Sequence, residues 1–597
     1  MQKTVEPARW FPAPRRRALA LAVLLAAAIP AARPQALPEP AAPVLPPAGV
    51  RYEIGNEIFH PVHAVHGMVA SESRLASQIG VDVLRAGGNA VDAAVAVGFA
   101  LAVTLPNAGN LGGGGFMVLH DAKRGREVAI DFRETAPAAA RRDMYLDADG
   151  RVIAEKSLFT PAAIGVPGTV AGLLHALDHY GSLPRARLIA PAAVLAERGF
   201  PVGERLARLL ADEADHLGAW PSTKKIFLPR GRPLRLGERL VQRDLARSLR
   251  EIARGGAPAF YQGRIGAAIA QQVRAGGGLI TRADLAGYRP LERVPVRTTY
   301  RGYEVVSMPP PSSGGTHVVE ILNMLSAFPL KDWGPGSART IHVLAEAMKR
   351  AYADRAEYLG DPDFVRVPVK GLTSPAYGAA LAARIDLAHA TPSARLGPGR
   401  PQPYESDQTT QFTVADAAGN VVSVTYTLNL NFGAGLVAEG TGILLNNEMD
   451  DFSAKPGVPN AFGLVGGEAN AIQAGKRPLS SMSPTLVLKD GKPWAATGSP
   501  GGARIITTTL QTLVDLIDFG MNPAEAAATP RVHHQWLPDE LRVERGLSPD
   551  TIALLVGLGH PVVERPAMGN TQTIQFGPAG LSGFSDPRNP DGATLGY

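Results

Sequence analysis

"TTQFTVADAAGNVVSVTYTLN", residues 409–429, contains two runs of alternating polar and apolar residues on either side of the turn-forming segment "DAAGN". Such alternation around a turn predicts a β-hairpin. If the turn centres on Ala418, residues whose numbers add up to 836 face each other, so Thr409 lies opposite Thr427. The pattern therefore predicts two threonine hydroxyls close enough to hydrogen-bond across the ladder.

The two faces of this hairpin differ in polarity, because successive side chains of a strand point to opposite faces. The polar face holds Thr409, Gln411, Thr413, Ser423, Thr425, Thr427 and Asn429, and the apolar face holds Phe412, Val414, Val422, Val424, Tyr426 and Leu428. One interpretation is a half-exposed hairpin that uses threonine for its β-propensity.

The other interpretation is that Thr409 is an N-terminal nucleophile. A threonine hydroxyl needs a base, and a free α-amine on the same residue, with a reference pKa of about 7.7 to 8.0, can be that base. This chemistry requires cleavage of the chain between Gln408 and Thr409.

The remaining sequence predicts layers of sheets and helices. Residues 72–88 and 89–104 have helical spacing, and the second segment is apolar on every side, as in a buried helix. Residues 110–121 and 126–134 are predicted strands, the chain from about 160 to 390 is mostly helical, and the strand-rich part after 409 contains one long helix at 503–518. This order is compatible with a sandwich of sheets covered by helices.

The N-terminus has the pattern of an export signal. Three arginines, Arg15 to Arg17, precede the apolar run "ALALAVLLAAAI" (18–29), and small residues follow to Ala36. We expect a signal peptide at 1–36 and a periplasmic or secreted protein; an uncleaved membrane anchor is the alternative. Without this segment the formal net charge falls from +6 to +1, so the basic character comes largely from the leader.

Composition excludes several classes of function. The chain has no cysteine, which excludes disulfides, thiol catalysis and thiolate metal sites. No basic stripe with interleaved aromatic residues is present, so no nucleic-acid partner is expected. "HHQW" (533–536) and the spacing of His317 and Glu320 do not form a zinc-type cluster, and we expect no metal and no cofactor.

Eight stretches, in order along the chain, resemble the γ-glutamyltransferases of the N-terminal nucleophile hydrolase superfamily: "GGNAVDAAVA", "GNLGGGGFM", "DFRETAP", "MPPPSSGG", "DQTT", "NNEMDDF", "RPLSSMSPT" and "GSPGGARI". The resemblance implies an α+β fold, a four-layer αββα sandwich. It also implies a precursor that cuts itself into a large fragment (37–408) and a small fragment (409–597), which remain together as a heterodimer without a covalent bond.

The same resemblance implies an activity and a set of site residues. Thr409 attacks the γ-glutamyl amide of glutathione or a related compound, and the acyl group passes to water or to an amino-acid or dipeptide acceptor. Thr427 resembles the threonine that hydrogen-bonds the nucleophile, and Asn429 resembles a contact to the α-amino acid end of the substrate. Arg133 resembles the arginine that binds the α-carboxylate, although an ion pair with Asp131 or Glu134 is the alternative from the residues alone.

Further residues complete this implied site. Asp451 and Glu448 resemble the acidic pair that receives the α-ammonium, although an acidic solvated turn is the alternative. Ser480 and Ser481 resemble hydrogen-bonding partners of the α-carboxylate, although a serine cluster before a proline is otherwise an ordinary turn. Gly501 and Gly502, at the start of an apolar helix, resemble an oxyanion hole; a phosphate loop is disfavoured because the Lys-Ser/Thr ending is missing.

Residues 450–467 resemble a lid loop over the glutamyl pocket. Phe462 stands where several relatives have tyrosine, and a phenylalanine cannot donate a hydrogen bond, for instance to Asn429. Two rival functions remain: a glutaryl or cephalosporin acylase on the same scaffold, and a non-catalytic periplasmic binding protein that never matures.

Overall fold

The computed structural model describes residues 58–397 and 409–597. The predicted leader (1–36) and Gln408 lie outside these ranges, so the signal peptide and the bond between Gln408 and Thr409 are not described. Among the helices of the described ranges, none combines the length and the apolar character that a bilayer span requires.

The predicted hairpin forms with the predicted register. Strands β10 (Thr410–Asp416) and β11 (Val421–Thr427) pair antiparallel, with Thr410 opposite Tyr426 and Gln411 opposite Thr425. Every residue of both strands is buried, so the half-exposed alternative is wrong. Thr409 directly precedes β10, at the same end of the ladder as Thr427.

Two seven-stranded sheets contain most of the β-structure. The first sheet has the order β21 (Ala593–Gly596), β2 (Gly67–Ser71), β10, β11, β3 (Gly114–Asp121), β4 (Arg126–Phe132) and β7 (Leu291–Arg293). The second sheet has the order β1 (Val62–Ala64), β20 (Gly580–Ser585), β19 (Gln572–Gly577), β15 (Lys492–Thr497), β14 (Thr485–Lys489), β9 (Tyr303–Ser307) and β8 (Val296–Tyr300). Both sheets thus combine strands from before and after Thr409.

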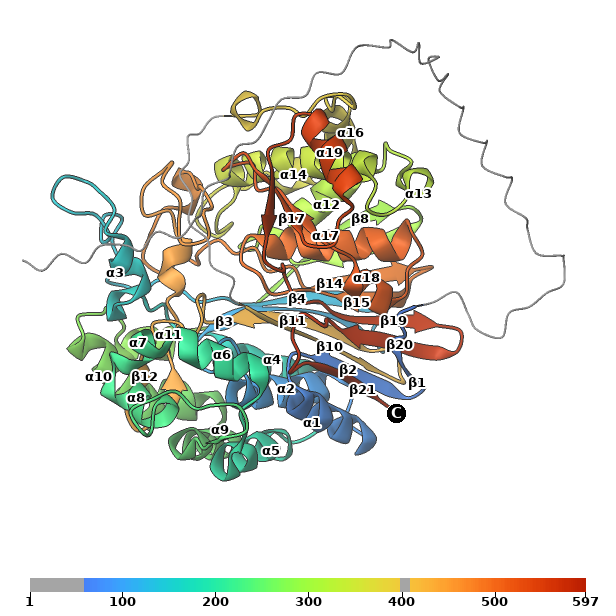
Figure 1. Cartoon of the computed structure of the whole chain (residues 1–597). Coiled ribbons are helices and arrows are strands. Elements are labelled where there is room, and N and C mark those ends of the chain that lie inside the picture. Colours follow the sequence, from blue (N-terminus) through green and yellow to red (C-terminus); the bar gives the residue numbers. More distant parts are fainter. Residues whose placement is uncertain (1–57, 398–408) are drawn as a thin grey trace, which may run out of the picture. The chain divides into compact units, whose positions relative to one another are not determined.

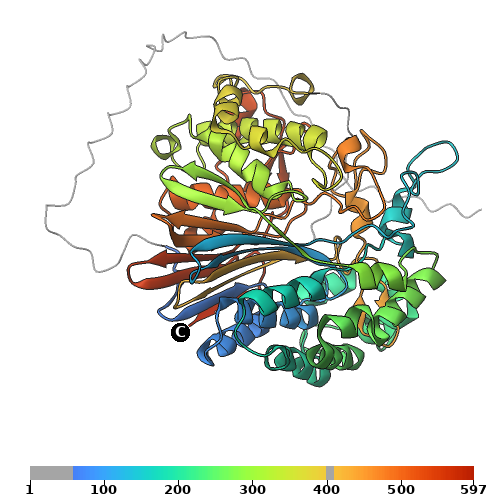
Figure 2. The same cartoon turned by 180° about the vertical axis from the view of Figure 1, so that it is seen from behind.

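The two sheets lie face to face between two layers of helices (Figures 1 and 2). Helices α1 (Arg74–Arg85), α2 (Ala90–Thr104) and α4 (Thr169–Tyr180) cover the outer face of the first sheet, with α5 (Arg185–Arg198) and α9 (Arg243–Tyr261) beyond them. Helices α12 (Gly314–Leu325), α14 (Ala338–Tyr358) and α17 (Arg504–Ile517) lie on the side of the second sheet. The predicted four-layer αββα sandwich is confirmed.

The predicted apolar helix α2 is buried along its whole length. It begins at Asn89, whose side chain accepts a hydrogen bond from the backbone of Asp92 while the Asp92 carboxylate accepts one from the backbone of Asn89, both at 2.9 Å. This reciprocal cap satisfies two amides at the start of the helix. The apolar face of the hairpin, including Phe412 and Val424, belongs to the same hydrophobic cluster as α2.

The polar face of the hairpin is buried between the two sheets. Gln411 bridges Ser423 (3.0 Å) and Thr425 (2.6 Å) across the ladder. The hydroxyls of Thr413 and Ser423 donate to backbone carbonyls of the second sheet, Gln572 at 2.7 Å and Thr497 at 3.0 Å. Buried polar groups without partners destabilise a fold, so these bonds explain how a polar face is accommodated inside the sandwich.

Candidate active site

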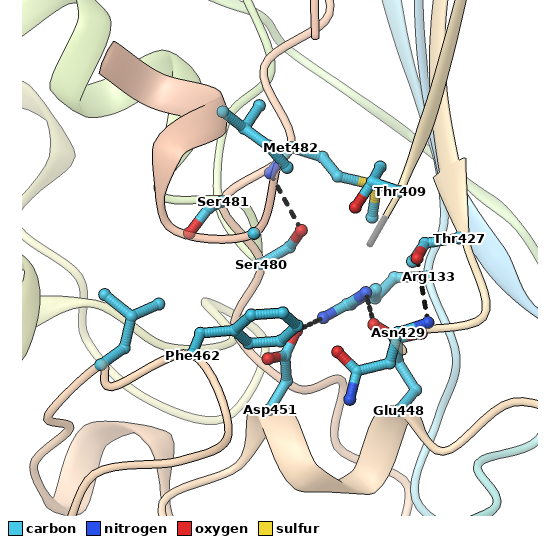
Figure 3. A pocket seen from close by; sticks show the side chains of 13 residues that line it. Arg133, Thr409, Thr427, Asn429, Glu448, Asp451, Phe462, Ser480, Ser481 and Met482 are labelled. Atoms are coloured by element: carbon cyan, nitrogen blue, oxygen red, sulfur yellow. Dashed lines mark hydrogen bonds and ion pairs between the residues drawn. The ribbon is translucent and has the colours of Figure 1, made fainter. Parts of the chain in front are cut away.

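A small pocket lies at the end of the hairpin where Thr409 begins β10, with an empty volume of about 270 Å³ (Figure 3). Its lining includes every predicted site residue except Gly501, which is adjacent to the lining residue Gly502, and Gln408, which lies outside the described residues. The lining residues are Arg133, Thr409, Thr427, Asn429, Glu448, Asp451, Phe462, Leu464, Ser480, Ser481, Met482, Gly502 and Ile505. The structure thus brings together side chains that are widely separated in the sequence.

Thr409 and Thr427 lie at the same end of the pocket (Figure 3), and we call this part the nucleophile end. Thr427 is the last residue of β11, and its hydroxyl accepts a hydrogen bond from the backbone N–H of Asn429 at 2.9 Å. Asn429 has a positive φ of 78°, a conformation that asparagine tolerates better than most residues. Its side chain donates to the carbonyl of Asn447 at 3.0 Å, which fixes this corner of the pocket.

Gly501 and Gly502 belong to the turn that leads into α17. Their φ angles are 134° and 54°, which side chains with a Cβ rarely adopt, and this explains the glycine pair. Their carbonyls accept hydrogen bonds from the backbone N–H groups of Arg504 (2.9 Å) and Ile505 (3.2 Å). Backbone N–H groups at a helix start have no partner within the helix and can stabilise a developing negative charge.

Arg133 follows directly after β4 and is fully buried. Its guanidinium forms ion pairs with Glu448 and Asp451, which are the two ends of one 3₁₀ turn (Glu448–Asp451), and a longer one with Glu134 at 3.9 Å. We call Arg133, Glu448 and Asp451, which line the pocket, together with the adjacent Glu134, the charged end of the pocket.

The alternative interpretation of Arg133, an ion pair with Asp131 or Glu134 at the end of the strand, agrees only partly with the structure. Glu134 is a distant partner, and the Asp131 carboxylate accepts a hydrogen bond from the backbone N–H of Arg133 at 3.0 Å. That carboxylate pairs with the guanidinium of Arg293 at 2.7 Å instead. The tighter partners of Arg133 are therefore remote in the sequence and lie in the pocket.

The charged end contains more carboxyl groups than guanidinium groups. Burial raises the pKa of Glu134 to about 7 against the opposing effect of Arg133, and burial also raises the pKa of Glu448 and of Asp451. A site in which acids surround one buried arginine is suited to a ligand that brings both a positive and a negative charge, because such a ligand can replace internal ion pairs without leaving a charge unpaired.

Ser480 and Ser481 form the wall opposite the hairpin (Figure 3). The Ser480 hydroxyl accepts a hydrogen bond from the backbone N–H of Met482 at 3.1 Å. The Ser481 hydroxyl accepts one from the guanidinium of Arg355 at 3.2 Å. The sequence did not single out Arg355, because nothing in the helical pattern of α14 distinguishes it from the other arginines of that helix.

The predicted lid segment covers the pocket with Phe462 and Leu464, which are 5% and 8% exposed. The side chain of Asn460 donates to Asp451 at 3.1 Å, and the backbone N–H of Ala461 donates to Asp450 at 3.0 Å. The lid is thus hydrogen-bonded to the acidic turn that also pairs with Arg133.

The histidines that could suggest a metal site have other partners. His317 and Glu320 are hydrogen-bonded to each other at 2.7 Å, and His533 is bonded to the hydroxyl of Thr507 at 2.8 Å. Within residues 58–397 and 409–597, no group of three or more His, Asp or Glu side chains is arranged to hold a metal ion.

Comparison with known proteins agrees with this geometry. The family described as Gamma-glutamyltranspeptidase matches residues 76–596. The glutathione hydrolase proenzyme of Escherichia coli (strain K12) is 57% identical over 93% of this chain and 96% of its own. Among solved structures, cephalosporin acylase from Bacillus halodurans has a TM-score of 0.80 at 30% identity and covers 93% of this chain and 99% of its own.

The γ-glutamyltranspeptidase of Helicobacter pylori has a TM-score of 0.54 at 45% identity and covers 59% of this chain and 99% of its own. The match of the family over most of the sequence and the high identity to a relative of nearly equal span both lead to one conclusion. The chain belongs to the γ-glutamyltranspeptidase family.

Proposed function

We propose that the protein is a γ-glutamyltransferase, or glutathione hydrolase, that cleaves the γ-glutamyl amide of glutathione and related compounds through an ester on Thr409. The observation that carries this proposal is that Thr409 and the charged end share one pocket. A nucleophile and a receptor for an α-amino acid group are the two parts that this reaction needs.

Maturation comes first in this mechanism. The Thr409 hydroxyl attacks the carbonyl carbon of Gln408, the peptide nitrogen leaves as the α-amine of Thr409, and water hydrolyses the resulting ester. The new α-amine then accepts the hydroxyl proton when Thr409 attacks the substrate amide, and the N–H groups of Gly501 and Gly502 stabilise the tetrahedral oxyanion. The amine product leaves with that proton, and water or an acceptor amine releases the γ-glutamyl group.

Recognition of the substrate uses the charged end. The α-ammonium takes the place of the Arg133 guanidinium beside Asp451 and Glu448, and the α-carboxylate pairs with Arg133 and accepts hydrogen bonds from Ser480 and Ser481. A guanidinium suits this role because its planar donors match the two oxygens of a carboxylate. Asn429 contacts the same end of the substrate.

The division into fragments 37–408 and 409–597 is part of the proposal. The fragments share the first sheet, in which β10 pairs with β2, and buried contacts such as that of Glu72 with Asn570 at 2.9 Å. These contacts would hold a heterodimer together without a covalent bond.

Export through the leader at 1–36 would place the protein in the periplasm or outside the cell.

A second function, hydrolysis of the side-chain amide of a β-lactam by a glutaryl or cephalosporin acylase, has support from the similarity to the Bacillus halodurans cephalosporin acylase. The charged end favours the γ-glutamyl substrate, because a glutaryl group has no ammonium to pair with Glu448 and Asp451. Turnover of γ-glutamyl-p-nitroanilide compared with glutaryl-7-aminocephalosporanic acid decides between them, and activity on the latter alone would contradict our proposal.

Intact mass of the purified protein tests maturation separately. We expect two fragments, the smaller one beginning at Thr409. A single uncut chain without turnover would instead favour a non-catalytic binding protein.

A further inference from the structure

Arg355 is a second buried arginine next to the pocket. It lies on α14 and is 5% exposed. Its guanidinium donates to the hydroxyls of Ser313 at 2.9 Å and Ser481 at 3.2 Å. In the part of the chain that the structure describes, no carboxylate forms an ion pair with it, so its charge is met at close range by hydroxyl groups.

This arrangement is unusual for a buried charge, which is normally paired. Arg350 on the same helix is also 5% exposed, and its guanidinium pairs with Glu346 at 2.7 Å and donates to the carbonyl of Arg384 at 2.9 Å. Burial lowers the pKa of Arg355 to about 10, while Tyr352 and Asp451 raise it, so the group is still cationic at neutral pH. A site next to this buried positive charge favours the binding of an anionic group.

Arg355 is linked to both serines of the pocket wall. It contacts Ser481 directly, and it contacts Ser480 through Ser313, whose hydroxyl and backbone N–H both donate to the Ser480 carbonyl, at 2.7 and 2.8 Å. A hydroxyl that accepts from a guanidinium keeps its own proton as a donor, and a carboxylate can only accept. The guanidinium therefore sets the position of the two serines and the direction in which the Ser481 hydroxyl donates.

The distribution of charges around the pocket also favours a carboxylate on the side of Ser480 and Ser481. Arg133 is already held between Glu448 and Asp451, so its charge is compensated before any substrate enters. Arg355 contacts Ser481 without lining the pocket itself, and it interacts electrostatically with Asp451 from beyond ion-pair distance. A carboxylate that binds on the side of Ser480 and Ser481 is therefore close to a positive charge that forms no ion pair with a carboxylate of the described residues.

We infer that Arg355 is a positioning and specificity-determining residue: it fixes the Ser480–Ser481 wall through Ser313 and Ser481, and its buried charge favours substrates that carry a carboxylate at this end of the pocket. This inference rests on the proposed function, because it concerns recognition of the same substrate.

The test compares two anilides on the matured enzyme: γ-glutamyl-p-nitroanilide and 4-aminobutyryl-p-nitroanilide, which keeps the amine and lacks the α-carboxylate. In Arg355→Met we expect kcat/KM for the first substrate to fall more than tenfold, mainly through KM, and that for the second to change less than threefold. Arg355→Lys restores part of the preference because it restores the charge. The matched control Arg350→Met, on the same helix with the same exposure, keeps the wild-type ratio of the two substrates.

Ser313→Ala is a second variant that retains the charge and removes the hydroxyl between Arg355 and the Ser480 carbonyl. The backbone N–H of residue 313 still donates to that carbonyl, so we expect an intermediate loss of preference. If Arg355→Met does not mature, as read from intact mass, Ser313→Ala and Arg355→Lys carry the test. An equal loss on both substrates, or an unchanged ratio, would overturn the inference. A wild type that hydrolyses both anilides equally would also overturn it while leaving the proposed function intact, whereas a wild type inactive on both would overturn both proposals.

Discussion

The two ends of the pocket are built in different ways. The nucleophile end consists of hydroxyls and backbone groups, and Thr409 and Thr427 are aligned by one hairpin whose strands are adjacent in the sequence. The charged end is assembled from ionic groups that are distant in the sequence, since Arg133 pairs with Glu448 and Asp451 more than 300 residues later. Backbone pairing fixes geometry, and charge pairing provides a receptor whose internal partners a ligand can replace. We therefore expect changes at the first end to abolish chemistry and changes at the second to alter affinity.

The largest effect is expected at the nucleophile end. Thr409→Ala removes the attacking hydroxyl, so the precursor stays uncut and turnover falls by at least about 10³-fold. Intact mass and release of p-nitroaniline measure the two effects. The neighbouring Thr410→Ser, on the other face of the strand, is the control and matures normally. Turnover by Thr409→Ala at the wild-type rate would refute the role of this residue.

Arg133→Lys tests the charged end. Lysine keeps the charge but cannot present the planar pair of donors, so we expect normal cutting and an increase in KM of about tenfold or more, which corresponds to about 1.4 kcal/mol. The control is Arg293→Lys, because Arg293 pairs with Asp131 and Asp363 and does not line the pocket. Loss of self-cleavage in Arg133→Lys would show that the two ends are not separable.

The same contrast explains what the sequence could predict. The register of the hairpin follows from alternation and a turn within 21 residues, and the structure has that register for every pair from Thr410 opposite Tyr426 to Ala415 opposite Val421. The αββα layers followed from the resemblance to the family, and the helical and strand patterns were compatible with them. Local periodicity was sufficient for the hairpin because strand pairing repeats every two residues.

The charged end has no such local pattern. From the residues alone, Arg133 had an ion pair with Asp131 or Glu134 as its nearest explanation, and only the resemblance pointed to Glu448 and Asp451. Arg355 was not predicted at all, because a buried arginine on a helix has no periodic signature and its partners, Ser313 and Ser481, come from two other segments of the chain. Contacts between remote segments depend on tertiary packing, which single-sequence patterns do not encode.

Glu134→Gln tests whether the excess of carboxyl groups at the charged end makes the stability of the protein depend on pH. Burial raises the pKa of Glu134 from an ordinary 4.5 to about 7, so the folded state retains a proton that the unfolded chain releases. Stability from this group is therefore fully present below pH 4.5 and is lost as the pH rises through 7. Between pH 5 and pH 8 we expect the free energy of unfolding to fall by about 2 kcal/mol less in Glu134→Gln than in the wild type. The measurement is the drop in Tm between the two pH values, which should be smaller in the variant. The exposed Glu439→Gln should leave the drop unchanged, and an unchanged drop in Glu134→Gln would show that Glu134 ionises normally.

Phe462→Tyr is the smallest change and probes the lid, which lies against the charged end. Phe462 lines the pocket together with Arg133, Asp451 and Asn429 (Figure 3), so an added hydroxyl would lie in a pocket that has carboxylate and amide acceptors. One neutral hydrogen bond contributes about 0.5–1.5 kcal/mol, and we expect KM for γ-glutamyl-p-nitroanilide to fall by about two- to tenfold with self-cleavage unchanged. The half-exposed Phe364, which does not line the pocket, provides the control Phe364→Tyr. If KM does not change in Phe462→Tyr, the lid acts on the charged end only by excluding water, and its packing rather than its polarity determines how the substrate is retained.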